Sequence, residues 1–149
     1  MAGTVNLHRV FTAPVERVYR GFTDPEALVK WMAPHGFTAK VHQMDLRVGG
    51  GYKMSFTNFT TKSVQSFGGT YTEIKPNQLL KYIDKFDDPN MPGEMKMTIS
   101  FREVIGGTEV KITQEGIPDM IPVEMCYVGW QQSLHLLAHV VEPTIPDGN

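Results

Sequence analysis

The stretch PVEMCYVGWQQSLHLLAHVVEP, residues 122–143, predicts one long amphipathic helix near the end of the sequence. Its apolar side chains recur at spacings of four and three, which place them on one stripe of an α-helix. The stripe consists of Val123, Tyr127, Trp130, Leu134, Leu137 and Val141. Pro122 suits the first turn, and Pro143 ends the periodic pattern. A helix of about 20 residues is about 30 Å long, enough to cross a small domain.

The middle of the sequence alternates apolar and polar residues, which is typical of strands with one buried face. The clearest case is 95–102, where Met95, Met97, Ile99 and Phe101 alternate with polar residues. The other predicted strands are Val5–Phe11, Phe37–Val48, Tyr52–Thr57, Gly68–Ile74, Leu80–Phe86 and Val110–Gln114. Glycines at 49–51 and 106–107 mark turns, the second of them a hairpin turn.

Two short helices are predicted between the first strand and the rest. Ala13-Pro14 opens one helix, which ends near Gly21, and Asp24-Pro25-Glu26 opens another, which stops before Pro34. The order is then one strand, two short helices, about six strands and one long helix. Antiparallel hairpins with a segregated helix define an α+β fold. We expect a single domain over 1–149, in which a curved sheet grips the long helix and can leave a cavity.

Composition excludes several classes of protein. The net charge of −2 and the pI near 6.2 argue against nucleic-acid binding, which needs a basic surface. No apolar run is long enough for a membrane span, and the first residues lack an apolar leader, so we expect a cytoplasmic protein. Cys126 is the only cysteine, so no internal disulfide can form. Nine methionines and many aromatic residues suit an adaptable apolar pocket, although an ordinary core would use them too.

Five segments in the expected order carry a family resemblance over most of the chain. They are Phe11–Pro14 with Val18-Tyr19, Asp24–Leu28 through Trp31–Pro34, Asp45–Gly50, Gly69–Pro76, and Gly129–Leu134 with Leu137. With these segments the chain resembles the activator-of-Hsp90-ATPase-homologue (AHSA1)-like family of the START/Bet v 1-like superfamily, also called SRPBCC.

The resemblance implies a helix-grip fold around a central apolar cavity. Members of this superfamily bind lipids, sterols, polyketides and other apolar molecules, and some are enzymes. The family is named after a co-chaperone with a separate N-terminal domain. This sequence shows no counterpart of that domain, so we do not carry over the co-chaperone role. The family signatures transfer no catalytic motif, and we expect no cofactor.

Under this fold the inner sheet face and the helix stripe predict the ligand-binding wall. The apolar candidates are Trp31, Met54, Phe56, Tyr82, Phe86, Met97, Ile99, Trp130, Leu134 and Leu137. Such side chains line ligand pockets, which combine apolar walls with few polar anchors. They could equally fill the interior at normal packing density.

Two polar residues interrupt the apolar faces. Alternation places Asp84 on the face of Tyr82 and Phe86, and Gln114 on the face of Val110 and Ile112. Burial would raise the pKa of the Asp84 carboxyl group, which could then anchor a ligand or act as a general acid or base. Both residues also lie near predicted strand ends, where water can reach them, and for catalysis we favour that simpler interpretation.

Other candidate groups are weaker. His135 and His139 are one turn apart, a spacing found in metal sites, but both lie well away from the apolar stripe and nothing completes a ligand set, so we expect no metal. His35 follows the Trp31–Pro34 segment and is most simply a solvated loop residue. Cys126 has no base beside it in sequence and is interpreted as a small core residue.

Three functions remain open. The first is non-catalytic binding of an apolar small molecule of lipid, polyketide or aromatic type. The second is a protein-interaction or stress-response module, or a homodimer, using Met125, Val128 and Leu136 beside the main stripe. The third is a small cyclase, dehydratase or hydrolase with Asp84 or His35 as general acid or base. We rank them in this order.

Overall fold

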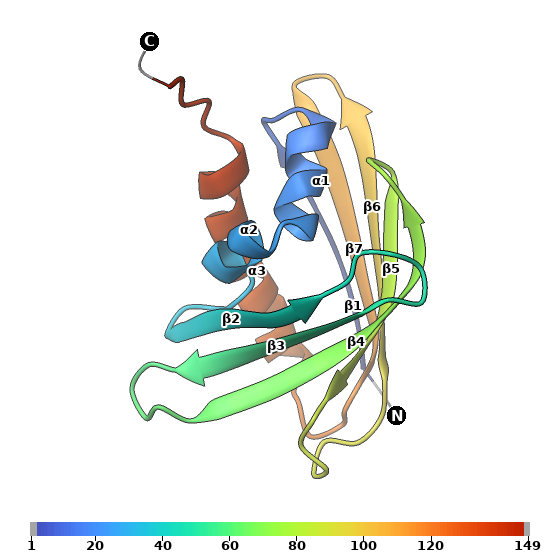
Figure 1. The fold of residues 1–149 in the computed structure, drawn as a ribbon, viewed down its shortest axis with the longest axis vertical. Helices are drawn as coiled ribbons and strands as arrows, with labels where there is room; N and C mark the ends of the chain where they lie inside the picture. The colour runs from blue at the N-terminus through green and yellow to red at the C-terminus, as the bar shows by residue number, and fades with distance from the viewer. Residues whose placement is uncertain (1–2, 148–149) are drawn as a thin grey trace.

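A curved antiparallel sheet wraps around the long C-terminal helix in this computed structural model, which describes residues 3–147 (Figure 1). The seven strands are β1 (Gly3–Phe11), β2 (Phe37–Met44), β3 (Gly51–Asn58), β4 (Val64–Lys75), β5 (Leu79–Phe86), β6 (Met95–Val104) and β7 (Gly107–Ile117). The helices are α1 (Val15–Thr23), α2 (Pro25–Trp31) and α3 (Val123–Val141). The strand order is β1-β7-β6-β5-β4-β3-β2, and each neighbouring pair is antiparallel. This confirms the predicted α+β helix-grip fold.

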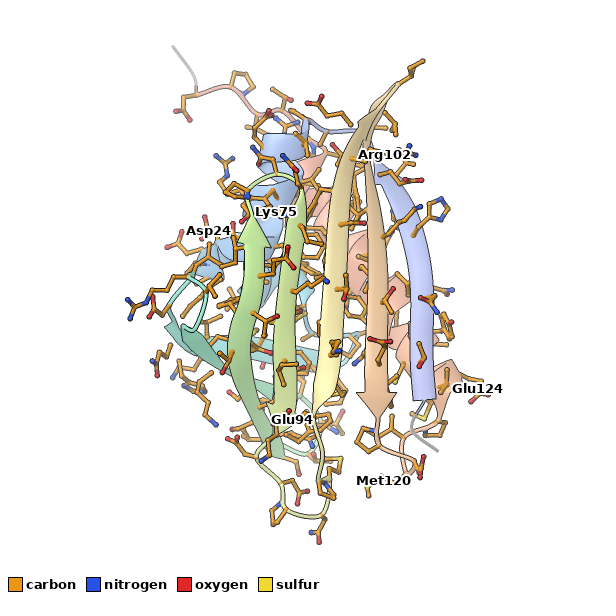
Figure 2. The ribbon with its side chains drawn as sticks, turned by 90° about the vertical axis from the view of Figure 1, so that its right-hand side faces the viewer. Asp24, Lys75, Glu94, Arg102, Met120 and Glu124 are labelled. Atoms are coloured by element: carbon orange, nitrogen blue, oxygen red, sulfur yellow. The ribbon has the colours of Figure 1, made fainter. Side chains whose placement is uncertain are left out.

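The helices lie on the concave face of the sheet, and the opposite face carries exposed polar side chains such as Lys75 and Arg102 (Figure 2). Alternation along β6 explains this division, because Met95, Met97, Ile99 and Phe101 are all buried while the residues between them are not. Each such strand therefore presents an apolar inner face to the helices.

The predicted stripe of α3 divides into two halves. Leu134, Leu137 and Val141 in the C-terminal half are buried. In the N-terminal half, Tyr127 and Trp130 are only partly covered, although they continue the same stripe. The C-terminal half thus packs tightly inside the fold, while the N-terminal half borders open space.

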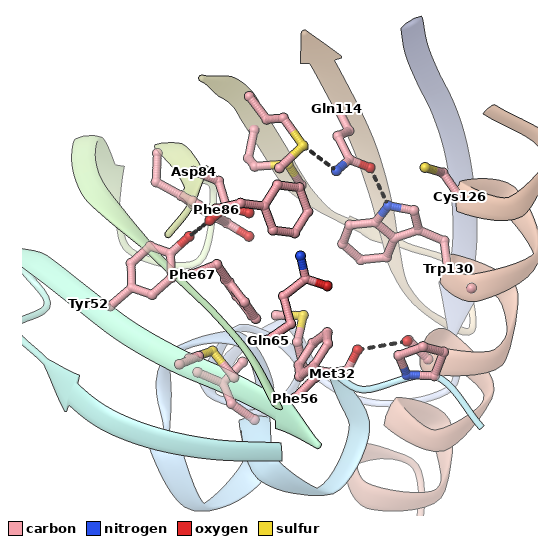
Figure 3. A pocket seen from close by; sticks show the side chains of 18 of the residues that line it. Met32, Tyr52, Phe56, Gln65, Phe67, Asp84, Phe86, Gln114, Cys126 and Trp130 are labelled. Carbon is pink, nitrogen blue, oxygen red and sulfur yellow. Dashed lines mark hydrogen bonds between the residues drawn. The ribbon is translucent and has the colours of Figure 1, made fainter. Parts of the chain in front are cut away.

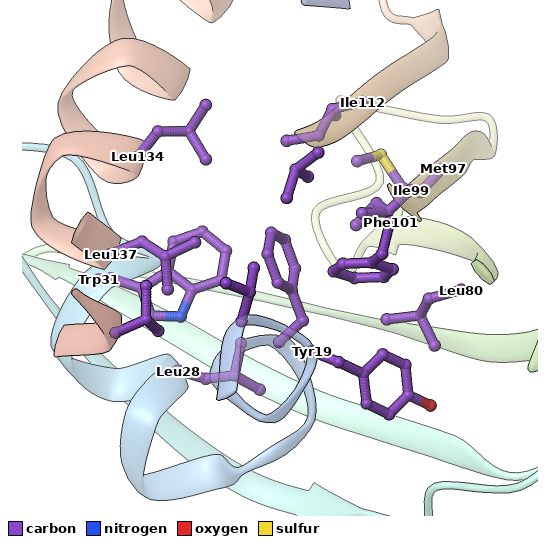
Figure 4. Close-up of a cluster of buried hydrophobic side chains, with 14 of the residues drawn as sticks. Tyr19, Leu28, Trp31, Leu80, Met97, Ile99, Phe101, Ile112, Leu134 and Leu137 are labelled. Carbon is purple, nitrogen blue, oxygen red and sulfur yellow. The ribbon is translucent and has the colours of Figure 1, made fainter. Parts of the chain in front are cut away.

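A solid core fills the end where α3 packs tightly (Figure 4). Gly21 of α1 makes this packing possible, because a Cβ atom there would lie 2.9 Å from side-chain atoms of Leu137 and Val141. Trp31 closes the same region: its Nε1–H donates to the Gly21 carbonyl oxygen over 2.7 Å, and its ring packs edge-on against Phe22. The short helices are thereby fixed to α3.

The strand boundaries that differ most from the sequence prediction are the end of β2 and the start of β4, each by four residues, while β7 extends three residues further at both ends. β2 ends at Met44 instead of Val48, because the chain then forms a tight turn in which the Gly50 amide donates to the Arg47 carbonyl. β4 begins at Val64 instead of Gly68. The glycines at 68 and 69 lie inside this strand rather than at its start. Because they have no side chains, the neighbouring strands β3 and β5 can approach closely there.

Candidate functional site

A cavity of about 290 Å³ lies between the N-terminal half of α3 and the inner face of the sheet (Figure 3). Helices α1 and α2 and the loop after α2 contribute Phe22, Leu28, Met32 and Pro34. Strands β3 to β7 contribute Tyr52, Met54, Phe56, Gln65, Phe67, Tyr71, Leu80, Tyr82, Asp84, Phe86, Met95, Met97 and Gln114. The segment leading into α3, and α3 itself, contribute Ile121, Met125, Cys126, Gly129, Trp130 and Ser133. This is the space that the N-terminal half of α3 leaves uncovered.

The wall is mostly aromatic and thioether. Phe67 stands edge-on to Phe56, with ring centroids 4.8 Å apart, and Phe86 lies beyond it at 6.5 Å. Edge-to-face contacts of this kind hold aromatic rings in fixed orientations. Methionines 54, 95 and 97 also line the cavity with flexible, polarizable side chains. The wall therefore combines fixed aromatic rings with adaptable thioether side chains.

Eight of the twelve predicted wall residues line this cavity, and four do not. Those in the wall are Met54, Phe56, Tyr82, Asp84, Phe86, Met97, Gln114 and Trp130. The other four, Trp31, Ile99, Leu134 and Leu137, instead belong to the solid core. Periodicity gave these four the correct face, but they lie towards the closed end of the molecule.

Asp84 and Tyr52 form the main polar contact of the wall. The Tyr52 hydroxyl donates to Asp84 Oδ1 over 2.5 Å, and Figure 3 shows the two side chains pointing towards each other. They reach across β4, since Tyr52 and Asp84 are both register partners of Gly69. A Cβ atom on Gly69 would lie 3.1 Å from the Tyr52 ring and far closer to the Ile83 carbonyl. Gly69 therefore leaves the space in which the tyrosine ring lies.

Burial raises the pKa of the Asp84 carboxyl group to about 6, although hydrogen bonds from Tyr52 and the Lys85 backbone amide act in the opposite direction. Burial and the neighbouring carboxylate hold the pKa of the Tyr52 hydroxyl far above its ordinary value. Asp84 pairs regularly with Gly69 and Met95, so it is not displaced at a loosened strand end. At neutral pH the site holds a carboxylate beside a neutral phenol.

The side-chain amides of Gln114 and Gln65 are further polar groups of the cavity wall. Gln114 Oε1 accepts from Trp130 Nε1 over 2.8 Å, which joins β7 to α3 across the cavity, while its Nε2 faces the Met95 sulfur at 3.3 Å. Gln65 Nε2 faces the sulfur of Met91 at 3.7 Å. Thioether sulfur is a weak acceptor, so both amide NH₂ groups can donate to a bound molecule.

Sequence reasoning missed Gln65 and the role of Tyr52. The predicted strand began at Gly68, which left Gln65 without an assigned face. Tyr52 lay on the recognised face of Met54 and Phe56, so alternation could have placed its hydroxyl group in the wall. Its bond to Asp84 depends on strand register, which alternation alone does not give.

Of the remaining candidates, Met125 and Cys126 line the cavity, and the three histidines do not. His35, His135 and His139 are exposed. Within residues 3–147, no three His, Cys, Asp or Glu side chains gather as a metal site would require. Cys126 lines the cavity, and burial raises the pKa of its thiol. Met125 and Val128 are 67% and 53% exposed, whereas Leu136 packs against the core. Of the three residues predicted to form an interaction or homodimer surface, only Met125 and Val128 are exposed.

No helix in the described part of the chain is long and apolar enough to cross a membrane.

The fold and the cavity together define a helix-grip domain of the SRPBCC class. Residues 12–142 match the sequence model of the family "Activator of Hsp90 ATPase homolog 1-like protein", so the chain belongs to that family, and the resemblance inferred from its sequence is confirmed. No curated protein shows a significant match to the chain.

Solved structures of several bacterial proteins share the fold. A protein from Chromobacterium violaceum is 52% identical, with a TM-score of 0.93 over 95% of this chain and 98% of that one. A protein from Nitrosomonas europaea is 24% identical, with a TM-score of 0.79 over 92% of both chains. An AHSA1-like protein from Aeromonas hydrophila is 21% identical, with a TM-score of 0.77 over 94% of this chain and 92% of that one.

Proposed function

We propose that the protein binds an apolar small molecule in the cavity between α3 and the sheet. The observation that carries this proposal is the wall itself, in which aromatic and methionine side chains surround about 290 Å³ and only a few polar groups interrupt them. Cavities of roughly this size with few polar anchors are typical small-molecule sites. The volume suits a molecule with one or two rings or a short chain.

The polar groups support binding with a defined orientation. Asp84 lies on β5, while the Gln114 amide is held beside α3 by its bond from Trp130. A ligand with one polar end could satisfy either group while its apolar part contacts the rings. Fixed polar groups in an apolar site give orientation and specificity rather than bulk affinity.

Gly129 offers a direct test, because it lines the cavity from α3 opposite Pro34. A Cβ atom at this position would meet only Pro34 Cβ, at 3.9 Å, so Gly129→Ala fits and serves as the matched control. Gly129→Leu would extend a side chain into the space between the two elements. We expect wild type and Gly129→Ala to bind 4-phenylbutan-1-ol in titration calorimetry, and Gly129→Leu to bind at least ~10-fold more weakly.

Circular dichroism would verify that all three proteins are folded. The proposal would be overturned if neither the alcohol nor the amine of the same skeleton, 4-phenylbutylamine, bound any of them, or if the alcohol bound Gly129→Leu as tightly as wild type.

A further inference from the structure

The cavity contains one charged side chain. Of the residues that line it, only Asp84 carries a charge at neutral pH, and no lysine, arginine or histidine of residues 3–147 lies in its wall. The nearby Lys53 ammonium group is paired with Asp87, outside the cavity. A buried carboxylate without a cationic partner is costly. The charged groups of the cavity wall are therefore unbalanced towards negative.

Asp84 also has unused acceptor capacity. It receives one hydrogen bond from the Tyr52 hydroxyl and one from the Lys85 backbone amide. A carboxylate offers about four lone-pair positions, so further donors can be accommodated. Since the residue is part of the cavity wall, a donor can come from a molecule bound there.

Aromatic rings surround the same region. Tyr82 lines the wall two residues before Asp84 on β5. Phe67 and Phe86 line the same side of the cavity, and Trp130 lies across from them on α3 (Figure 3). The faces of such rings attract cations, and the attraction is stronger where water is excluded. The carboxylate and the rings thus favour the same sign of charge in a ligand.

We propose that the ligand is an apolar molecule with a protonated amine at one end, and that this amine binds Asp84. This inference rests on the proposed function and names its ligand class. The ammonium group would donate to the carboxylate while the apolar part contacts the aromatic and methionine wall. A neutral hydroxyl in the same place would gain a weaker hydrogen bond, because bonds between two charged groups are stronger. A carboxylate head would meet a like charge.

The pH dependence of amine binding follows from the titratable groups that line the cavity together with Asp84. These are Tyr52 on β3, Tyr71 on β4, Tyr82 on β5 and Cys126 on α3, and burial raises the pKa of each. They therefore stay neutral between pH 5 and 7.5. Asp84, whose pKa is raised to about 6, is mostly ionised at pH 7.5 and mostly protonated at pH 5. Amine affinity should fall by up to ~10-fold over that interval as pH decreases.

Three ligands of similar shape test the proposal by titration calorimetry: 4-phenylbutylamine, 4-phenylbutan-1-ol and 4-phenylbutyrate. At pH 7.5 we expect wild type to bind the amine at least ~10-fold more tightly than the alcohol, and the carboxylate most weakly. At pH 5 the preference for the amine should largely disappear. Asp84→Asn should bind the amine and the alcohol about equally tightly, with a ratio of their dissociation constants of ~1, at both pH values. Trp31→Phe, which changes the solid core, should retain the wild-type ratio.

The two proposals fail in different ways. If wild type bound the amine and the alcohol equally at pH 7.5, the amine proposal would be wrong while apolar ligand binding remained supported. The same conclusion would follow if Asp84→Asn kept the preference. If none of the three ligands bound the wild-type protein, the proposed function itself would be wrong. The pH series on the wild-type protein needs no variant, so it decides the matter even if Asp84→Asn does not fold.

Discussion

Asp84 lowers the stability of the folded protein at neutral pH. Its pKa is raised from an ordinary 3.8 to about 6, so the folded state holds the proton more tightly than the unfolded chain does. Asp84 therefore contributes most to stability below pH 3.8, and this contribution is lost as pH rises through 6. At roughly 1.4 kcal/mol per pH unit, the difference amounts to about 3 kcal/mol at pH 7.5. Retaining such a residue in a cavity is typical of a functional group.

Asp84→Asn should therefore stabilise the protein at pH 7.5, by up to about 3 kcal/mol in urea unfolding. The amide is close to the carboxyl group in shape and can still accept from Tyr52. Its advantage should shrink as pH falls from 7 to 4 and vanish below 3.8, where Asp84 is protonated in both states. A variant less stable than wild type at pH 7.5 would contradict this account of the carboxylate.

How well single residues could be predicted depended on strand register. Alternation alone placed Asp84 and Gln114 on inner faces, and both line the cavity. The partner of Asp84 could not be derived, because Tyr52 belongs to a strand two positions away and reaches it over Gly69. Gly69 makes the Tyr52–Asp84 contact possible, but it has no side chain and so adds nothing to the apolar and polar alternation from which strand faces are predicted.

The two tryptophans show how position along an element changes a role. Trp31 ends α2 inside the solid core, with its indole N–H bonded to Gly21. Trp130 lies in the N-terminal half of α3, with its indole N–H bonded to Gln114 in the cavity wall. Both indoles are hydrogen-bonded, but only one of them can touch a ligand.

Replacing each tryptophan by phenylalanine should separate stability from binding. Trp31→Phe leaves the buried Gly21 carbonyl without its donor and opens space in the core, so we expect a loss of about 1–3 kcal/mol in the free energy of unfolding. Ligand affinity should stay within about 2-fold of wild type. Trp130→Phe should cost less stability but change the affinity for 4-phenylbutan-1-ol, because Gln114 is no longer held.

Urea unfolding and calorimetry on both variants would check this division. If Trp31→Phe altered affinity as much as Trp130→Phe does, the boundary drawn between core and cavity would be wrong.

At the scale of elements, periodicity predicted the long helix within a residue of its observed ends and the correct face of every inner strand named for the wall. It could not divide the α3 stripe into a packed half and a cavity half. Leu134 and Trp130 occupy equivalent positions in the pattern, and only the curvature of the sheet distinguishes them. The start of β4 was predicted at Gly68 instead of Val64 because glycines are typical of turns, whereas Gly68 and Gly69 lie inside the strand.

For the whole molecule, the cavity means that folding leaves part of the interior without contacts. Apolar side chains that line a cavity make fewer dispersion contacts with other protein atoms than they would in a packed core. A ligand that fills the space supplies them and binds only the folded state. Its binding must therefore stabilise the protein, with a magnitude set by concentration and affinity.

We expect 4-phenylbutylamine at 100 times its dissociation constant to stabilise the wild-type protein by about 2.7 kcal/mol. In a chain of this length, that corresponds to a rise in Tm of roughly 5–10 °C, measurable by differential scanning calorimetry at pH 7.5. The shift should be preserved in Gly129→Ala and should fall by about half or more in Gly129→Leu at the same concentration, because an at least ~10-fold weaker affinity leaves no more than about 1.4 kcal/mol of stabilisation. An equal shift in both variants would place the amine on some other surface, since a molecule bound elsewhere would not sense the side chain at position 129.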